Sequence, residues 1–187
     1  MANILDILLT RTGDRLLEKS QEITKLDSEV FKKSFVYSLP SLLIIYSNKS
    51  EFKTGKHNNL IALIENEDII QAGKQNAQSL TDPEIQVFLQ YAEILDVEKK
   101  DLKDILYLSL AILTSIISEM MENSDLKFQD IIKTLSGLET KNSEAYLKVL
   151  LKNAEDPNII DNREEILLGR KNKDDDQSLL GGYTGGR

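Results

Sequence analysis

Apolar residues recur at intervals of three and four positions through almost the whole chain, rather than at every second position. Glycine and proline, which interrupt helices, are sparse, with 9 and 3 in 187 residues. Side chains three and four positions apart lie on one face of an α-helix, so this pattern indicates amphipathic helices. We therefore predict an all-α fold, a compact helical bundle of about six to eight helices.

The first two helices are predicted from this spacing and from residues that begin or interrupt a helix. The first should cover residues 4–20, with Gly13 as a weak point, because glycine destabilises a helix interior. The second should begin at Asp27 or Ser28, since either side chain can accept hydrogen bonds from the free amides of the first turn. It should end before Asn48.

The middle of the chain predicts shorter helices followed by one specific start signal. Two short helices are expected at residues 59–65 and 67–72, and the polar stretch 73–80 should separate them from the next helix. Thr81-Asp82-Pro83-Glu84 then places a capping residue just before a proline, with acid in the first turn, which is typical of a helix N-terminus. That helix should run to about Leu95.

The longest helix is predicted at residues 98–123, opened by Asp96 and apolar on nearly all sides in its middle. A helix that is hydrophobic all round belongs at the centre of a core. Further helices should cover residues 126–135 and 143–153. The composition then changes, so we divide the chain into a helical domain at residues 1–153 and an extended C-terminal tail at residues 154–187, acidic and then Gly-rich.

The two central helices are preceded by a similar sequence. Leu26-Asp27-x-Glu29 is followed by Ser38-Leu39, and Leu95-Asp96-x-Glu98 is followed by Ser109-Leu110, with two extra residues in the second copy. The echo predicts two pseudo-repeated halves. The alternative, that amphipathic helices always look somewhat alike, stays open on the sequence.

Several segments resemble a bacterial family of uncharacterised function, the DUF937 or YidB-like proteins. Asn3-Ile4-Leu5-Asp6-Ile7-Leu8 is similar to the short Leu-rich helix that begins the family, and Leu39-Pro40-Ser41-Leu42-Leu43, with Asn48 after it, to the centre of its second helix. His57-Asn58-Asn59-Leu60 resembles a loop segment, and residues 96–117 resemble a later capped apolar helix. The resemblance covers about residues 1–135 and implies a helical fold, with no established activity.

The chain departs from that family at residues 65–70. Many members carry an Asp-x-Asp-Gly-Ser-like stretch there, whereas this chain has Glu65-Asn66-Glu67-Asp68-Ile69-Ile70, without a glycine turn. The resemblance therefore gives no argument for a calcium-binding loop.

Composition and charge narrow the classes of function. The chain has no cysteine, which excludes disulfides and thiolate chemistry and agrees with a reducing compartment, so we expect a cytoplasmic protein. The formal net charge of −8 disfavours binding to a nucleic-acid backbone. The longest uncharged runs, residues 34–48 and 105–118, are shorter than the roughly 20 residues of a membrane span. We expect them to be buried core helices, the first kinked at Pro40.

Candidate catalytic and metal-binding residues are few. His57 is the only histidine and stands in a polar loop, so neither a zinc site nor a Ser-His-Asp triad is expected. Lys53-Thr54-Gly55-Lys56 lacks the earlier glycine of a phosphate-binding loop, since position 50 is Ser50.

Pairs of carboxylates also occur one helical turn apart, as in Glu18 with Glu22 and Asp101 with Asp104. They could in principle share a metal, but the sequence has no Glu-x-x-His pair of a di-iron bundle, and solvated helix faces explain these carboxylates better. We expect no catalytic residue, no cofactor and no metal, and therefore no enzyme.

The tail has a pattern of its own, an acidic triplet followed by spaced apolar residues in a Gly-rich ending. These candidate partner-binding residues are Asp174, Asp175, Asp176, Leu179, Leu180 and Tyr183. Apolar anchors on a polar tether are typical of a short docking peptide. The alternative is a disordered tail with chance hydrophobic residues.

These observations favour a non-enzymatic protein–protein interaction or assembly component, which binds a protein partner or associates with itself through the tail. One alternative is a small-molecule or lipid binding module, with a cavity of about 300 Å³ or more lined by Leu and Ile between apolar helices. Another is a nucleic-acid- or ribosome-associated factor that uses the lysines between Lys32 and Lys56.

Overall fold

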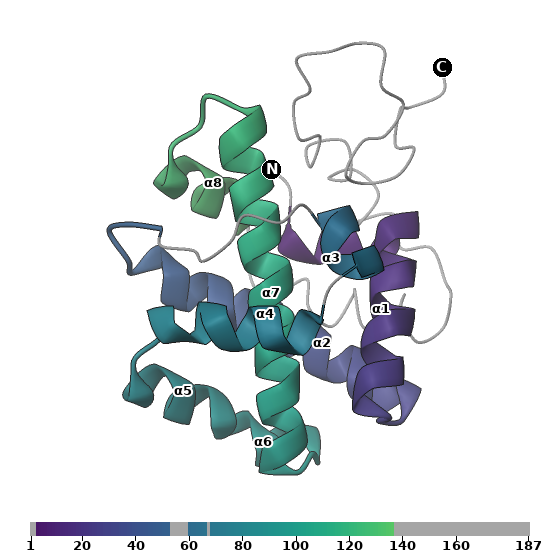
Figure 1. Cartoon of the computed structure of the whole chain (residues 1–187). Helices are drawn as coiled ribbons and strands as arrows, with labels where there is room; N and C mark the ends of the chain where they lie inside the picture. Colours follow the sequence, from purple (N-terminus) through teal and green to yellow (C-terminus); the bar gives the residue numbers. More distant parts are fainter. Residues whose placement is uncertain (1–2, 53–59, 67, 137–187) are drawn as a thin grey trace.

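The structure, a computed structural model, describes residues 3–52, 60–66 and 68–136 (Figure 1). Within these ranges the all-α class is confirmed, and the one β-type pairing there is an isolated bridge. The elements are η1 (Ile4–Leu9), α1 (Arg11–Thr24), α2 (Ser28–Ser47), α3 (Leu60–Asn66), α4 (Ile69–Asn76), η2 (Ala77–Ser79), α5 (Asp82–Leu89), α6 (Tyr91–Leu95), α7 (Lys99–Asn123) and α8 (Phe128–Leu135), where η marks a 3₁₀-helix. The predicted helix at residues 143–153 and the boundary after residue 153 lie outside the described residues.

Helix α7 forms the centre of the bundle. It lies between α4 and α2, and both pack along it (Figure 1). Every residue from Leu108 to Ser118 is buried, so the middle of the helix is enclosed on all sides, as its apolar sequence predicted. Of the helices described, α7 is the one whose length and composition would suffice to cross a membrane, but 78% of that apolar stretch is buried inside the fold.

The crossing of α4 and α7 requires a glycine. A Cβ atom on Gly73 would lie 1.9 Å from the carbonyl oxygen of Tyr107, which is far inside van der Waals contact. Asn76 Nδ2 also donates to Thr114 Oγ1 at 2.7 Å across the same pair of helices. The expectation of a polar, non-helical stretch at residues 73–80 was therefore wrong. Here glycine provides room for close packing instead of breaking the helix.

The single N-terminal helix expected at residues 4–20 is in fact two. The chain forms η1, becomes extended at Thr10 and restarts as α1. The Thr10 hydroxyl donates to the Ile7 carbonyl at 2.7 Å and accepts from the Gly13 amide at 3.0 Å, so one side chain ends the first helix and begins the second. Gly13 is not a weak point, because a Cβ atom there would lie 2.0 Å from the Ile7 carbonyl oxygen.

Helices α2 and α5 begin where the sequence predicts. Asp27 accepts hydrogen bonds from the first amides of α2, and the helix continues through Pro40. Thr81 precedes α5, and its amide donates to the Glu84 carboxylate at 2.7 Å. The helix expected to reach residue 95 is divided by a turn at Gln90 into α5 and α6.

The two echoed segments meet at the crossing of α2 and α7. Ser38 and Ser109 occupy equivalent positions in the two copies, and their hydroxyl oxygens lie 2.6 Å apart in the core. The starts of the two copies differ, however. Asp27 caps α2, whereas Asp96 has a left-handed backbone with a φ of 54° and ends α6. The prediction that Asp96 opens the long helix was therefore wrong, and α7 begins at Lys99.

The first and last residues of the described part of the chain, Asn3 and Ser136, lie next to each other. Asn3 and Ser136 form the isolated antiparallel bridge. Helix α8 packs on α2 and α7 through an apolar face that includes Phe128 and Ile131. The segment that follows residue 136 therefore starts close to α2.

Candidate functional site

The residues predicted to bind a partner, Asp174, Asp175, Asp176, Leu179, Leu180 and Tyr183, lie outside the described residues. His57 and the segment 53–56 lie outside them as well. The candidate site is therefore one that the described helices form, judged by the exposure, charge and hydrogen bonds of their side chains.

The outward face of α2 is the feature that differs most from an ordinary protein surface. Lys33, Tyr37, Pro40 and Ile44 follow one another at spacings of four, three and four, so they form one stripe along the helix. We call these four residues the α2 stripe. Lys33, Tyr37 and Pro40 are half-buried, and Ile44 is 57% exposed. The uncharged run 34–48 was expected to be buried, and this expectation was wrong on one side of the helix.

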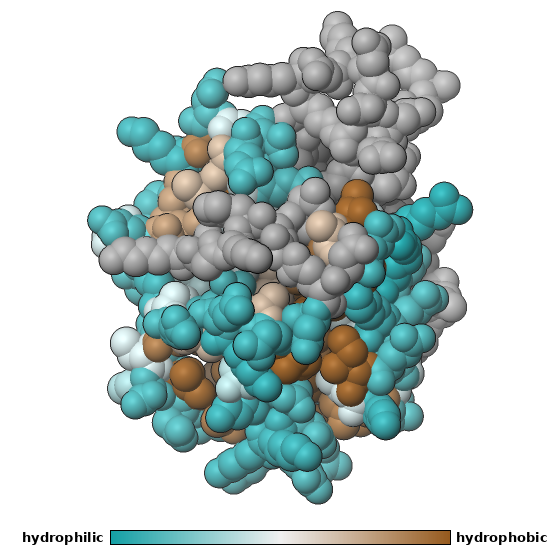
Figure 2. All heavy atoms as spheres, in the orientation of Figure 1, coloured by the Kyte–Doolittle hydropathy of each residue, from teal (hydrophilic) through white to brown (hydrophobic). Residues whose placement is uncertain are grey.

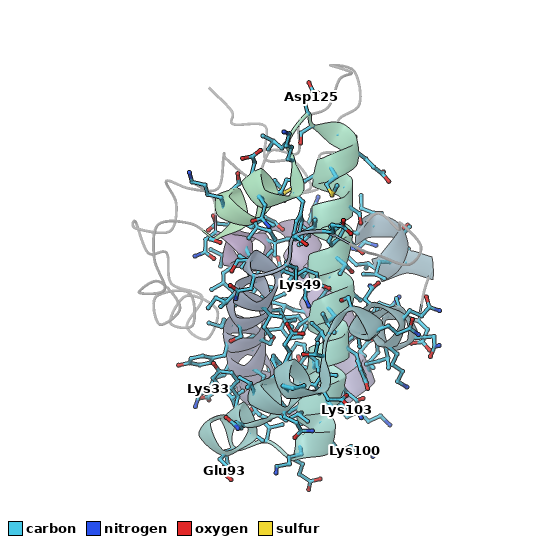
Figure 3. The ribbon with its side chains drawn as sticks, turned by 90° about the vertical axis from the view of Figure 1, so that its left-hand side faces the viewer. Lys33, Lys49, Glu93, Lys100, Lys103 and Asp125 are labelled. Carbon is cyan, nitrogen blue, oxygen red and sulfur yellow. The ribbon has the colours of Figure 1, made fainter. Side chains whose placement is uncertain are left out.

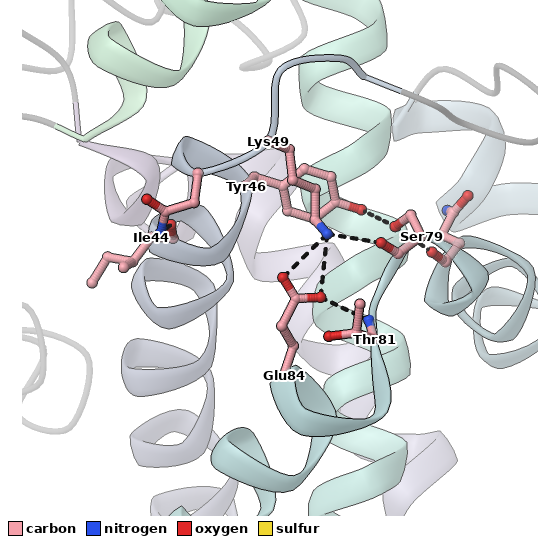
Figure 4. Close-up of polar contacts among 8 residues, drawn as sticks. Ile44, Tyr46, Lys49, Ser79, Thr81 and Glu84 are labelled. Carbon is pink, nitrogen blue, oxygen red and sulfur yellow. Dashed lines mark hydrogen bonds and ion pairs between the residues drawn. The ribbon is translucent and has the colours of Figure 1, made fainter.

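The position of α2 explains this exposure. The helix packs on α7 through its inner side, where Phe35, Leu39 and Leu42 are fully buried, and it forms an outer layer of the bundle. Figure 4 shows the Ile44 side chain pointing away from the polar contacts on the other side of the helix. On the face drawn in Figure 2, apolar side chains form small separate patches among hydrophilic ones. The α2 stripe, in contrast, has only one charged residue over three helical turns.

A polar cluster lies on the opposite side of the C-terminal end of α2. Lys49 Nζ donates to the Glu84 carboxylate at 3.2 Å and to the carbonyl oxygen of Ser79 at 2.8 Å (Figure 4). The Tyr46 hydroxyl lies 2.9 Å from the Ser79 hydroxyl. These contacts join the end of α2 to η2 and to the start of α5. They give the cluster a structural role, because each of these polar groups is already used to hold two elements together.

The ionisation of this cluster follows from its surroundings. Partial burial acts to raise the pKa of Glu84, but the hydrogen bonds from Thr81 and the charge and hydrogen bond of Lys49 together hold that pKa below its ordinary value. Burial raises the pKa of Tyr46, and the neighbouring Glu84 charge raises it further, against the opposing hydrogen bond with Ser79. Glu84 is therefore an anion and Tyr46 a neutral phenol at neutral pH.

Aromatic residues fix the loop that follows α2. The Phe52 ring stacks on Phe128 of α8 at a centroid distance of 5.4 Å and lies 6.2 Å from the Tyr46 ring. Gln129 donates to the Lys49 carbonyl oxygen at 2.6 Å. The loop from Asn48 to Phe52 thus connects α2, α5 and α8, while within the α2 stripe Tyr37 packs partly against the core and Ile44 stays exposed.

Of the lysines in the nucleic-acid hypothesis, Lys32 and Lys33 lie near the start of α2, and Lys49 lies just after its end. Lys49 is engaged by Glu84, while Lys53 and Lys56 lie outside the described residues. Figure 3 shows Lys33 and Lys49 well apart, toward the two ends of α2. The structure does not bring the described members of this set into one basic surface.

Two lysines lie near a half-buried tyrosine on α7. The ammonium groups of Lys74 and Lys103 lie 5.8 Å and 6.0 Å from the centroid of the Tyr107 ring, within the range of a cation–π contact. Asp101 and Asp104 lie on the same stretch of helix, so the local charge is mixed. This group resembles an ordinary solvated helix face.

A shallow cleft of about 250 Å³ lies between α5, α6 and the start of α7. Its lining is mostly polar, with Gln86, Gln90, Glu93 and Lys99 beside Leu89. This composition differs from the Leu- and Ile-lined cavity that a lipid or apolar ligand requires. Between α2 and α7, the fully buried leucines and the Ser38–Ser109 contact fill the crossing with protein atoms.

Carboxylates do not gather into a metal site in the described part of the chain. No three Asp, Glu or His side chains come together there in a way that could hold an ion. The predicted pairs, Glu18 with Glu22 and Asp101 with Asp104, are therefore not extended by a third ligand among the described residues.

The stripe was missed at the sequence level because the uncharged run carries no mark of which side faces solvent. Its apolar residues surround the helix, and the packing of α7, α8, η1 and, to a lesser extent, α1, α5 and α6 against the other sides determines which side faces outward. No family model, curated protein or solved structure matches the chain. The resemblance to the YidB-like family stays a prediction.

Proposed function

We propose that this chain is a non-enzymatic protein-interaction or assembly component, with its contacts made by the α2 stripe and by the C-terminal segment. The observation that carries the proposal is the outward face of α2, where an isoleucine is 57% exposed on a helix without a charge from residue 34 to residue 48. A surface of this kind gains free energy when another apolar surface covers it, at roughly 25 cal/mol per Å² buried.

The remaining chemistry supports the same proposal. The polar groups nearest to α2 serve to join elements, and the cleft between α5, α6 and α7 has a mostly polar lining. Contiguous apolar surface that is exposed to solvent, as on the outward face of α2, is typical of protein contact sites. The proposal of a protein-interaction component therefore rests mainly on the α2 stripe. The segment with Leu179, Leu180 and Tyr183 supplies a second set of apolar contacts.

The experiment compares substitutions at two equally exposed apolar residues. Ile44 on α2 is 57% exposed and Val87 on α5 is 56% exposed. The full chain, Ile44→Glu and Val87→Glu are each sedimented in extracts of the source organism and as purified protein over a range of concentrations. Ile44→Glu should shift the chain to smaller species, and Val87→Glu should leave its sedimentation unchanged.

A chain without residues 174–187 belongs in the same series, because the proposal assigns contacts to that segment. Its sedimentation should differ from that of the full chain. The proposal is wrong if the full chain, the Ile44→Glu variant and the shortened chain all sediment as the same monomer under every condition.

A further inference from the structure

The α2 stripe has a defined order of charge and apolar groups. Lys33 stands at its N-terminal end and has no carboxylate partner among the described residues, whereas Lys49, beyond the other end, is paired with Glu84. From Lys33 the stripe continues through Tyr37 and Pro40 to Ile44 without another charge. A complementary segment would therefore carry acid at one end and uncharged, apolar residues after it.

The C-terminal segment has this order. Asp174, Asp175 and Asp176 are followed by an uncharged stretch from residue 177 to residue 186, which contains Leu179, Leu180 and Tyr183. We propose that residues 174–183 dock on the α2 stripe of the same molecule, with the aspartates at Lys33 and the leucines at Ile44. This inference rests on the proposed function and names the occupant of its contact surface.

The lengths of the two partners agree. Eleven residues of helix separate Lys33 from Ile44, which at 1.5 Å per residue is about 16 Å. Five extended residues from Asp175 to Leu180 also span about 16 Å, at roughly 3.3 Å per residue. An extended segment placed parallel to α2 thus brings acid to the lysine and leucine to the isoleucine at the same time. Tyr183, three extended residues or about 10 Å farther on, then lies just beyond the C-terminal end of the helix.

The connection also permits docking within one molecule. The chain leaves the described helices at Ser136, next to Asn3, and α8 directly before it packs on α2. Roughly 40 residues separate Ser136 from the docking segment, and a linker of that length spans far more than the width of one domain. A tethered segment has an effective concentration in the millimolar range, so even a weak contact is occupied intramolecularly.

A second copy of α2 is a poorer occupant of the stripe. An antiparallel pair of α2 helices would place Lys33 against the uncharged residues near Asn48, and a parallel pair would place it against another Lys33. Neither arrangement gives Lys33 an anion, and the second adds repulsion. The aspartates of the C-terminal segment supply that anion.

The test places a photo-reactive group on the proposed anchor in the full chain. Tyr183 is replaced by p-benzoylphenylalanine, the dilute protein is irradiated, and the cross-linked residues are identified by mass spectrometry. We expect cross-links within one chain, to residues 44–52 at the C-terminal end of α2 and just after it. Ile44→Glu should lower their yield about tenfold, as expected when one apolar anchor is replaced by a charged side chain, while Val87→Glu should not.

A charge exchange tests the orientation independently of folding. Lys33→Glu should lower the cross-link yield, and combining it with Asp174→Lys, Asp175→Lys and Asp176→Lys should restore it. Circular dichroism and thermal melting of each variant show that the helices are intact. The inference is overturned by cross-links to other elements, by cross-links only between chains, by no cross-link, or by equal yields in Ile44→Glu and Val87→Glu.

The two proposals fail in different ways. If residues 174–183 cover the stripe, deleting residues 174–187 should increase association with partners several-fold, because the stripe becomes free. Sedimentation that responds to Ile44→Glu together with cross-links away from α2 would overturn the docking inference alone. Sedimentation that responds to no variant would overturn the proposed function.

Discussion

The hydroxyl oxygens of Ser38 and Ser109 lie 2.6 Å apart, fully enclosed by the core, where α2 crosses α7. Each serine occupies the same position in one copy of the echoed sequence, so the two copies meet through their own small polar residues. Ser38→Ala leaves the Ser109 hydroxyl without this partner in the core, which costs about 1–3 kcal/mol, whereas after Ser109→Ala the Ser38 hydroxyl still donates to the Phe35 carbonyl at 3.3 Å, so that the cost is smaller. Replacing both removes the unsatisfied group.

Ser38→Ala and Ser109→Ala should therefore each lower the free energy of unfolding. The loss in the double variant should be smaller than the sum of the two single losses. Urea unfolding of the four proteins gives the coupling energy directly. Strict additivity would show that the two hydroxyls make no energetic contact. Ser41→Ala, whose side chain bonds only to the Tyr37 carbonyl within its own helix, provides a comparison.

Gly73→Ala tests the close crossing of α4 and α7. The added methyl carbon would lie 1.9 Å from the Tyr107 carbonyl oxygen, so one helix has to move. We expect a loss of roughly 3 kcal/mol or more, at the upper end of the cost of overpacking. Thermal melting measures it, with Gln75→Ala, on the exposed side of the same helix, as the control. A melting temperature equal to that of the control would contradict the observed crossing.

The Lys49–Glu84 contact predicts a pH dependence of stability. The folded-state pKa of Glu84 is below its ordinary value of 4.5, so the folded protein binds the proton less readily than the unfolded chain. The contribution of Glu84 is therefore complete above that ordinary value and is lost as the pH falls through the folded-state pKa. Glu84→Gln should lower stability at pH 7 and make little difference at the lowest pH. A Glu84→Gln difference that stays constant between pH 7 and pH 3 would contradict this assignment.

The two aspartates of the echoed sequence should respond differently to substitution. Asp27 accepts the Glu29 amide at 2.9 Å as the cap of α2, so Asp27→Ala should cost about 1 kcal/mol. Asp96 has a φ of 54°, a conformation that glycine adopts without strain, so Asp96→Gly should be neutral or stabilise the protein by up to about 1 kcal/mol. Chemical denaturation of both variants measures the contrast. A loss of stability in Asp96→Gly equal to that in Asp27→Ala would argue for a capping role at both sites.

The sequence predicts the helices well where local chemistry decides them and poorly where a distant contact does. Asp27 and Thr81 mark helix starts because their own side chains or amides form the first bonds of the turn. Gly73 was misjudged because its reason is the carbonyl oxygen of Tyr107, which comes close only in the folded state. The break at Thr10 was missed because a threonine inside an apolar pattern gives no sign that it serves two helices at once.

The α2 stripe illustrates the same limit for the candidate site. Residues 34–48 are uncharged on every side, and the run therefore predicts burial without naming an exposed face. The arrangement of all the elements that pack on α2 decides which side stays open, and Ile44 on that side is as exposed as Val87 on α5. Composition alone identifies residues 34–48 as an uncharged segment. Only the three-dimensional packing shows that Ile44 is exposed within it.

The bridge between Asn3 and Ser136 has a mechanical consequence. A pulling force applied through the chain on either side of residues 3–136 would act on one end of the bundle, where Asn3 and Ser136 pair. It would break that bridge before it stretched any long helix. Helix α8, whose apolar face packs on α2 and α7, would then separate from these helices one contact at a time. Helix α7, in the middle of the bundle, would carry tension last.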